Sequence, residues 1–185
     1  TKQIYMMNNS GSYQYYSDTT IKCIRLPYGR GKIAMYICLP DTLDYLDTIT
    51  NISSPTVLNN YFINSRVTEF DEIKIPKFKI AYGAKNLYNV LKKLGMGIAF
   101  DPMNADFSNI RPINGSETIF IQKVAHKAII DVNEEGTEAA AVTSVELGLT
   151  YVSEKYKFIV NRPFIFYIRD DRTGTILFMG KIIDP

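Results

Sequence analysis

A segment of alternating small and polar residues near the C-terminal end constrains the fold of this chain more than any other feature. From Thr137 onward every second residue is small or apolar, while the residues between them are more polar. Such a period of two predicts a strand with one buried and one solvated face, because successive side chains of a strand point to opposite faces. The small or apolar set is Thr137, Ala139, Ala141, Thr143, Val145, Leu147 and Leu149.

Local propensity favours a different structure for part of the same segment. Residues 134–141 contain good helix formers on both sides of a single glycine, Gly136. A segment suited to two conformations, solvent-tolerant as a loop and packable as a central strand, is typical of proteins that switch between two packings. The alternative is a surface loop or helix whose alternation is accidental, and the pattern alone leaves both interpretations open.

The rest of the chain is dominated by predicted strands, so the fold class is α+β. The clearest element is a hairpin in which residues 20–27 and 32–39 flank a glycine-containing turn. Pro76 interrupts a second β-rich run and marks an edge, a bend or a change of sheet. Other strands are predicted at residues 67–80, 118–132, 155–168 and 175–183, and helices after Ser54 and at residues 86–94.

Charge and hydropathy exclude two classes of partner. The chain carries 21 Lys and Arg against 19 Asp and Glu, a formal net charge of +2. This charge is too balanced for the basic stripe that a nucleic-acid-binding protein usually needs. The longest apolar run, residues 33–39, is too short to span a membrane. We therefore expect neither nucleic acid nor a membrane as a partner.

No cofactor, metal or catalytic site is predicted. One histidine and no C-x-x-C are too few for the usual zinc ligand sets, and Cys23 and Cys38 are expected to be buried, reduced thiols. The single histidine, His126, has apolar neighbours at period two in a predicted strand, so we expect it to point into the core. Four acidic residues match no known metal loop: Asp131, Glu134, Glu135 and Glu138.

Five motifs resemble those of a known protein family. Residues 132–141 are similar to the reactive-loop hinge of the serpins, and residues 160–168 are similar to the signature segment of that family. Three further stretches agree with the family in order and spacing, at residues 75–78, 91–107 and 177–181. Because the motifs follow in the right order over nearly the whole chain, the sequence is identified as a member of the serpin family.

The resemblance implies the serpin fold, with several β-sheets, short helices and an exposed reactive-centre loop at about residues 135–155. A serpin is roughly twice as long as this chain, and the matched motifs all belong to its C-terminal half. We therefore expect residues 1–185 to be the C-terminal half of a single serpin domain, either as a fragment of a longer chain or as a chain that pairs with its missing N-terminal half. Alone, such a half would expose sheet edges and apolar faces that need partners.

The function that the resemblance implies is inhibition of a serine endopeptidase, not enzymatic activity. The protease cleaves the exposed loop and forms an acyl-enzyme, and the loop then inserts into the central sheet and traps the protease in a covalent complex. Family grounds favour a secreted protein. The alternatives are a non-inhibitory serpin-fold binding or carrier protein, and an unrelated hydrolase that uses His126, for which no triad partner is marked.

Insertion of the loop requires a flexible entry point and side chains that are buried at little entropic cost. Gly136 supplies the first, and the small hinge residues Thr137, Ala139, Ala141 and Thr143 supply the second. By resemblance, the scissile bond lies near Thr150–Tyr151, with Leu149 and Val152 as neighbours. The absence of Arg or Lys there argues against trypsin-like targets. Leu149 or Tyr151 suits a chymotrypsin-like pocket, and Thr150 or Val152 suits an elastase- or subtilisin-like one.

Two further roles come from the resemblance, and both concern structural control. Glu134, at the base of the loop, is expected to pair with Lys77 where the loop enters the sheet. His126 corresponds to a histidine of the family that lies under the central sheet, and its expected partners belong to the missing half.

Overall fold

The computed structural model describes residues 4–42, 55–110, 118–134 and 156–185. The chain divides into two units, one of residues 1–78 with 132–185 and one of residues 79–131. The predicted α+β class is confirmed, because both units are built on sheets and the helices are short.

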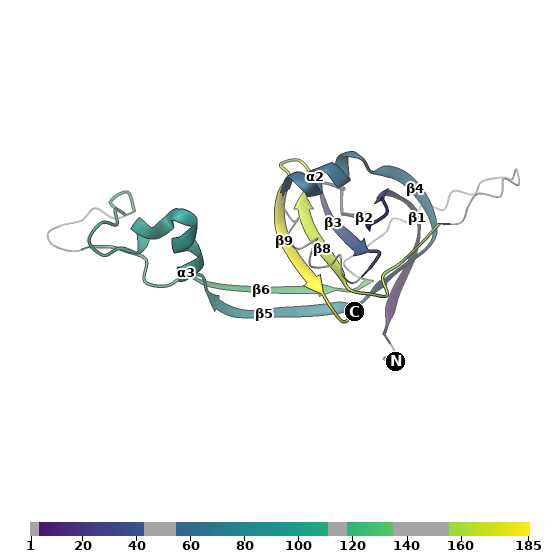
Figure 1. Ribbon diagram of the computed structural model, residues 1–185. Coiled ribbons are helices and arrows are strands. Elements are labelled where there is room, and N and C mark those ends of the chain that lie inside the picture. The colour runs from purple at the N-terminus through teal and green to yellow at the C-terminus, as the bar shows by residue number, and fades with distance from the viewer. Residues whose placement is uncertain (1–3, 43–54, 111–117, 135–155) are drawn as a thin grey trace, which may run out of the picture. The chain divides into compact units, whose positions relative to one another are not determined.

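A seven-stranded sheet forms the first unit, with the strand order β7-β4-β1-β2-β3-β8-β9 (Figure 1). All neighbouring strands are antiparallel except β4 and β7, which are parallel. The strands are β1 (Met6–Ser17), β2 (Ile21–Tyr28), β3 (Ile33–Pro40), β4 (Arg66–Pro76), β7 (Tyr156–Ile159), β8 (Phe164–Asp170) and β9 (Thr175–Ile182).

The predicted hairpin is confirmed as β2 and β3, which pair without interruption from Ile21↔Pro40 to Tyr28↔Ile33. Its turn is closed by a hydrogen bond of 2.8 Å from the Gly31 N–H to the Tyr28 carbonyl. Gly29 and Gly31 have φ of +48° and +76°, a region that glycine enters without a steric penalty. The local sequence thus fixes both the turn and the register.

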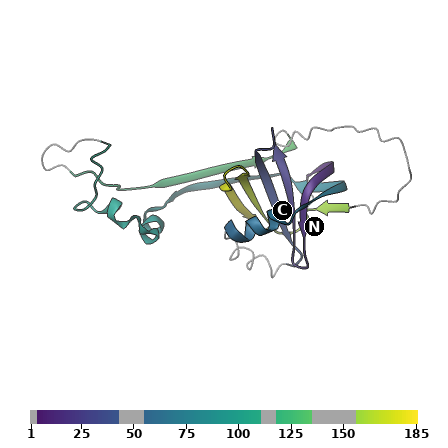
Figure 2. The same ribbon diagram turned by 90° about the horizontal axis from the view of Figure 1, so that it is seen from above.

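Helix α2 (Pro55–Ile63) covers one face of this sheet (Figures 1 and 2). It begins at the proline predicted for its first position, where the missing N–H is not needed. Leu58, on its inner face, is 3% exposed. Leu58 packs in one cluster with sheet residues that share this face: Ile21, Cys23, Ala34, Tyr36, Cys38, Ile165 and Tyr167.

The strand predicted over residues 155–168 is divided into β7 and β8. Pro163 has no N–H to continue a ladder, and Arg162 turns its side chain towards the end of β3. The Arg162 Nε donates a hydrogen bond of 2.6 Å to the Pro40 carbonyl, and its Nη2 lies 3.2 Å from Asp41 Oδ1. The break therefore allows one arginine to fasten β8 to the end of the hairpin.

The chain changes sheet at Pro76, which is one of the three roles predicted for this residue. β4 ends there, and β5 (Phe78–Asn86) pairs with β6 (Ala125–Val132) in a separate two-stranded sheet (Figure 2). The strand predicted over residues 118–132 forms a ladder only from Ala125. The preceding residues 118–124 carry no ladder, because β5 ends at Asn86 and offers them no partner strand.

The predicted helix at residues 86–94 is shorter than expected. It consists of α3 (Tyr88–Leu91) and a π-turn (Lys92–Met96), followed by a 3₁₀ turn (Gly97–Phe100). Gly95 has a φ of +100°, which ends the helix where the sequence predicts. Val90 and Leu94, which the spacing of four places on one face of the predicted helix, are 53% and 75% exposed. No helix in the described part of the chain is long and apolar enough to cross a membrane.

Candidate functional site

The predicted loop leaves β6 and returns as β7, so the described residues form its two anchors. Val132, the last residue of β6, is 7% exposed, and Tyr156 begins β7 beside Phe70 of β4. The predicted hinge and reactive-bond residues lie outside the described residues. These are Gly136, Thr137, Ala139, Ala141 and Thr143 in the hinge, and Leu149, Thr150, Tyr151 and Val152 around the bond.

The expected contact between Lys77 and Glu134 is present at the departing anchor. The Lys77 Nζ lies 2.5 Å from Glu134 Oε1, and the Lys77 N–H donates a hydrogen bond of 3.1 Å to the Tyr5 carbonyl. The backbone of Lys77 is therefore held by the chain that leads into β1. The hydrogen bond from Lys77 lowers the pKa of the Glu134 carboxyl. Both side chains are exposed, so the pair fixes a position more than it adds stability.

Two lysines close to Lys77 in the sequence, Lys74 and Lys79, also have acidic partners. The Lys79 Nζ lies 2.7 Å from Asp131 Oδ2, across the β5–β6 ladder, and this hydrogen bond raises the pKa of Lys79. The Lys74 Nζ lies 2.5 Å from Glu72 Oε1 on the same strand. The three lysines are thus neutralised in place and form no free basic surface.

His126 differs from the expectation that it would point into the core. It lies near the start of β6 and is exposed. The physical reason is that β6 pairs with β5 in a sheet of two strands within the described chain, so the apolar neighbours at period two do not indicate a buried face.

Among the described residues, no three His, Cys, Asp or Glu side chains cluster closely enough to hold a metal ion.

Strand β6 has an edge on which a strand can be added. Among the described residues its ladder is made with β5 alone, so the other edge of β6 has no strand beside it in this part of the protein. A segment that follows β6 directly in sequence and folds back beside it must run antiparallel to it, as in a hairpin. This edge therefore suits strand addition.

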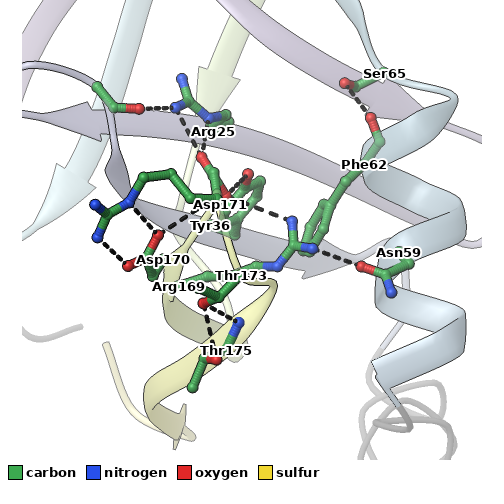
Figure 3. Close-up of polar contacts among 12 residues, drawn as sticks. Arg25, Tyr36, Asn59, Phe62, Ser65, Arg169, Asp170, Asp171, Thr173 and Thr175 are labelled. Carbon is green, nitrogen blue, oxygen red and sulfur yellow. Dashed lines mark hydrogen bonds and ion pairs between the residues drawn. The ribbon is translucent and has the colours of Figure 1, made fainter.

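A second polar cluster, the Asp171 network, lies in the turn between β8 and β9 (Figure 3). Asp171 Oδ2 accepts a hydrogen bond of 2.9 Å from the Arg25 Nε, and Oδ1 accepts one of 2.7 Å from the Tyr36 hydroxyl. Arg169 lies 3.4 Å from the same carboxylate, and its Nη2 donates a hydrogen bond of 2.7 Å to Asn59 Oδ1. The carboxylate therefore joins β2, β3 and β8, and through Arg169 it reaches helix α2.

The ionisation of this network follows from its burial and its charges. Burial, together with the hydrogen bond to Asp171, raises the pKa of Tyr36 to about 12. The Arg169 guanidinium lies 4.9 Å from the centroid of the Phe62 ring, a distance at which a cation is attracted to the ring face. The neighbouring Asp170 pairs with Arg172, and this hydrogen-bonded pair lowers the pKa of the Asp170 carboxyl to about 2. Sequence reasoning missed this cluster, because Arg25 and Asp171 are 146 positions apart and no motif links them.

Comparisons with known proteins agree on one family. The family model for serpins (serine protease inhibitors) matches residues 1–185. The chain is 36% identical to the intracellular coagulation inhibitor 2 of Tachypleus tridentatus, over 98% of this chain and 44% of that protein. It is 33% identical to the leukocyte elastase inhibitor A of Rattus norvegicus, over 100% of this chain and 50% of that protein.

The structural comparison gives the same result. A crystal structure of native protease nexin-1 with heparin matches with a TM-score of 0.78 and 30% identity, over 100% of this chain and 48% of that one. The chain thus spans about half the length of the relatives that it matches.

Proposed function

The chain belongs to the serpin family of serine protease inhibitors. From this premise we propose that it carries the reactive-centre loop of a suicide-substrate inhibitor, which contains both the cleavage site and the strand that inserts into the sheet. A serine endopeptidase cleaves the loop near Thr150–Tyr151, and its nucleophilic serine becomes acylated. The hinge that begins at Gly136 then enters the sheet as a new strand next to β6. The protease remains covalently attached to the loop as an acyl-enzyme, moves with it during insertion and is trapped in that covalent complex.

The observation that carries this proposal is the anchor at the base of the loop. Glu134 is held by Lys77, and the small-residue hinge starts two positions later. An anchored base defines where the chain begins to fold back, while Gly136 leaves the next residues free to turn. The alternate small residues of the hinge can then be buried without a large loss of side-chain entropy.

The pairing of β6 with β5 alone among the described residues supports the same proposal, because it leaves a second edge of β6 for another strand. An added strand gains ladder hydrogen bonds along β6 and buries the small face of the hinge, so the inserted state is more stable than the exposed loop. Conformational trapping requires such a difference in free energy, because the inhibitor must complete insertion before the acyl-enzyme is hydrolysed.

The proposed domain is the C-terminal half of one serpin domain, completed by an N-terminal half. The exposed apolar side chains of the second unit support this arrangement, since Val90, Leu94 and Ile98 are 53%, 75% and 66% exposed. The proposed target is a chymotrypsin-, elastase- or subtilisin-like enzyme. The residues around the proposed bond are Leu149, Thr150, Tyr151 and Val152, and none of them is basic.

The test is to mix the full-length protein with chymotrypsin, elastase, subtilisin and trypsin, and to separate the products on denaturing gels. We expect a covalent complex with at least one of the first three enzymes and none with trypsin. The matched control is the same protease with its nucleophilic serine replaced by alanine, which cannot form the acyl bond. Clean cleavage by all of the enzymes without any complex would support the non-inhibitory binding or carrier alternative instead.

A further inference from the structure

The two cysteines of the chain lie directly opposite each other in the β2–β3 hairpin. Cys23 and Cys38 are register partners, their Sγ atoms are 2.7 Å apart, and both thiols are free. Their exposures are 4% and 0%. The strands thus bring together two thiols that are 15 positions apart in the sequence.

The hydrogen-bond pattern shows which kind of antiparallel pair they form. The Asp41 N–H donates a hydrogen bond of 2.9 Å to the Thr20 carbonyl, so these two residues form a hydrogen-bonded pair at the end of the hairpin. The two kinds of pair alternate along a ladder. The next pair contains Pro40, which has no N–H to donate, and is therefore non-hydrogen-bonded. Two steps further along, Cys23 and Cys38 form the same kind of pair.

This kind of pair suits a disulfide bond. In non-hydrogen-bonded pairs the Cα atoms are about 4.5 Å apart and the side chains are close. Disulfides occur at Cα separations of roughly 4.4 to 6.8 Å, so the strands need little movement to be joined. At the neighbouring hydrogen-bonded pairs the side chains are further apart.

Helix α2 packs over the two thiols in the folded protein. The cysteines belong to the cluster that Leu58 covers, with Tyr16 and Tyr61 packed against it. Burial raises the pKa of the Cys23 thiol, and the thiolate is the species that attacks a disulfide. The finished fold therefore keeps the pair unreactive and also excludes an oxidant. While α2 is undocked in the folding chain, Leu58 does not cover the two thiols, so we expect them to be accessible then.

We propose that Cys23 and Cys38 form a disulfide across β2 and β3 when the protein folds in the presence of a small disulfide oxidant such as oxidised glutathione. One cysteine thiolate attacks the oxidant, forms a mixed disulfide and releases one glutathione thiolate. The second cysteine then attacks the first cysteine's sulfur, loses its proton and releases the second glutathione. The protein loses two hydrogens, and one oxidised glutathione becomes two reduced molecules. Docking of α2 then buries the bond.

The test uses the full-length protein, refolded from denaturant with either oxidised or reduced glutathione. Free thiols are alkylated, the protein is digested with trypsin, and the peptides are identified by mass spectrometry. We expect a linked peptide that joins Cys23 to Cys38 after oxidative refolding, and two alkylated peptides after reducing refolding. The linked protein should melt about 5 °C higher, because the bond constrains the unfolded chain.

Two comparisons make the result specific. Oxidised glutathione added to the reduced, already folded protein should give little linkage, because the thiols are covered. The matched control is Lys22→Cys/Leu39→Cys in a Cys23→Ser/Cys38→Ser background, which moves the pair by one position to a hydrogen-bonded site and should link less. The proposal is overturned if oxidative refolding leaves both native cysteines alkylated, if the folded protein links as fast as the refolding chain, or if the control pair links as readily as the native one.

Discussion

At the scale of single residues, Gly180 shows why a strand position in one of the family-like motifs is a glycine. An ideal Cβ atom at Gly180 would lie 2.5 Å from the Cε1 atom of Phe166, whose side chain is 2% exposed. The backbone of Gly180 does not have a positive φ, so the constraint is contact with the ring and not conformational freedom. A larger side chain in β9 must displace a buried aromatic ring of β8.

We therefore expect Gly180→Ala to lower the free energy of unfolding by about 1 to 3 kcal/mol, as overpacking of a core does. The matched control is Gly83→Ala in β5, where the added Cβ meets nothing within 4 Å and stability should change little. Urea denaturation of the full-length variants measures both. Equal effects of the two substitutions would show that the Phe166 contact is not the cause.

Tyr36 gives a prediction about pH, because its pKa is raised from 10.0 to about 12 in the folded protein. A raised pKa means that the neutral phenol stabilises the fold. This stabilisation is complete below pH 10 and is lost as the pH rises towards 12. Tyr36→Phe removes the hydrogen bond to Asp171, so we expect a loss of about 1 kcal/mol at pH 7 and a weaker dependence on pH between 10 and 12.

Denaturation at several pH values checks this expectation. Tyr28→Phe is the control, because burial alone raises the pKa of Tyr28. Removal of the Tyr28 hydroxyl group should therefore leave the free energy of unfolding at pH 7 nearly unchanged. Tyr16, whose pKa is also about 12, should preserve part of the alkaline slope in both variants. A Tyr36→Phe protein with the stability of the parent at pH 7 would contradict a role for the Asp171 hydrogen bond.

At the scale of elements, the helices and strands that depend on local sequence can be predicted, whereas contacts between residues far apart in the sequence cannot. The β2–β3 hairpin follows from a glycine turn between two β-rich runs, and Pro55 correctly predicts the start of α2. The pairing of Lys77 with Glu134 was predicted from the family resemblance and not from the local pattern. The start of the β6 ladder, the exposure of His126 and the Asp171 network depend on which strands and charges lie nearby. Periodicity carries no information about those neighbours.

The alternation in the hinge leads to a prediction for one element that can be tested with a matched pair. The alternation predicts that Ala139 lies on the face that is buried on insertion and that Ala140 lies on the solvated face. Ala139→Glu should slow insertion, because it buries a charge, and should convert the inhibitor into a substrate. Ala140→Glu introduces the same side chain and should retain inhibition.

The measurement is the ratio of covalent complex to cleaved inhibitor after reaction with an enzyme that forms the complex. We expect this ratio to fall at least tenfold for Ala139→Glu and to change little for Ala140→Glu. A similar fall in both variants would refute the strand interpretation of the hinge and favour a loop or helix whose alternation is accidental.

At the scale of the whole molecule, the proposed mechanism predicts that cleavage stabilises the protein. Insertion of residues from Gly136 onward adds a strand to β6, with new ladder hydrogen bonds and new burial. Limited proteolysis between Leu147 and Val152 should therefore raise the melting temperature of the full-length protein by tens of degrees. Calorimetry before and after cleavage measures this change, and the Ala139→Glu variant is the control that should gain less. An unchanged melting curve after complete cleavage would argue against a metastable starting state.

The parallel pairing of β7 with β4 has a consequence for the fate of the cleaved chain. A cut near Thr150–Tyr151 leaves a C-terminal peptide that carries β7, β8 and β9. Backbone pairing of β7 with β4 and of β8 with β3 holds this peptide in the sheet. The cleaved molecule should therefore migrate as one particle under native conditions and release a small second polypeptide only when it is denatured. In a native mass measurement, the cleaved protein and the intact one would differ by the mass of a single water molecule.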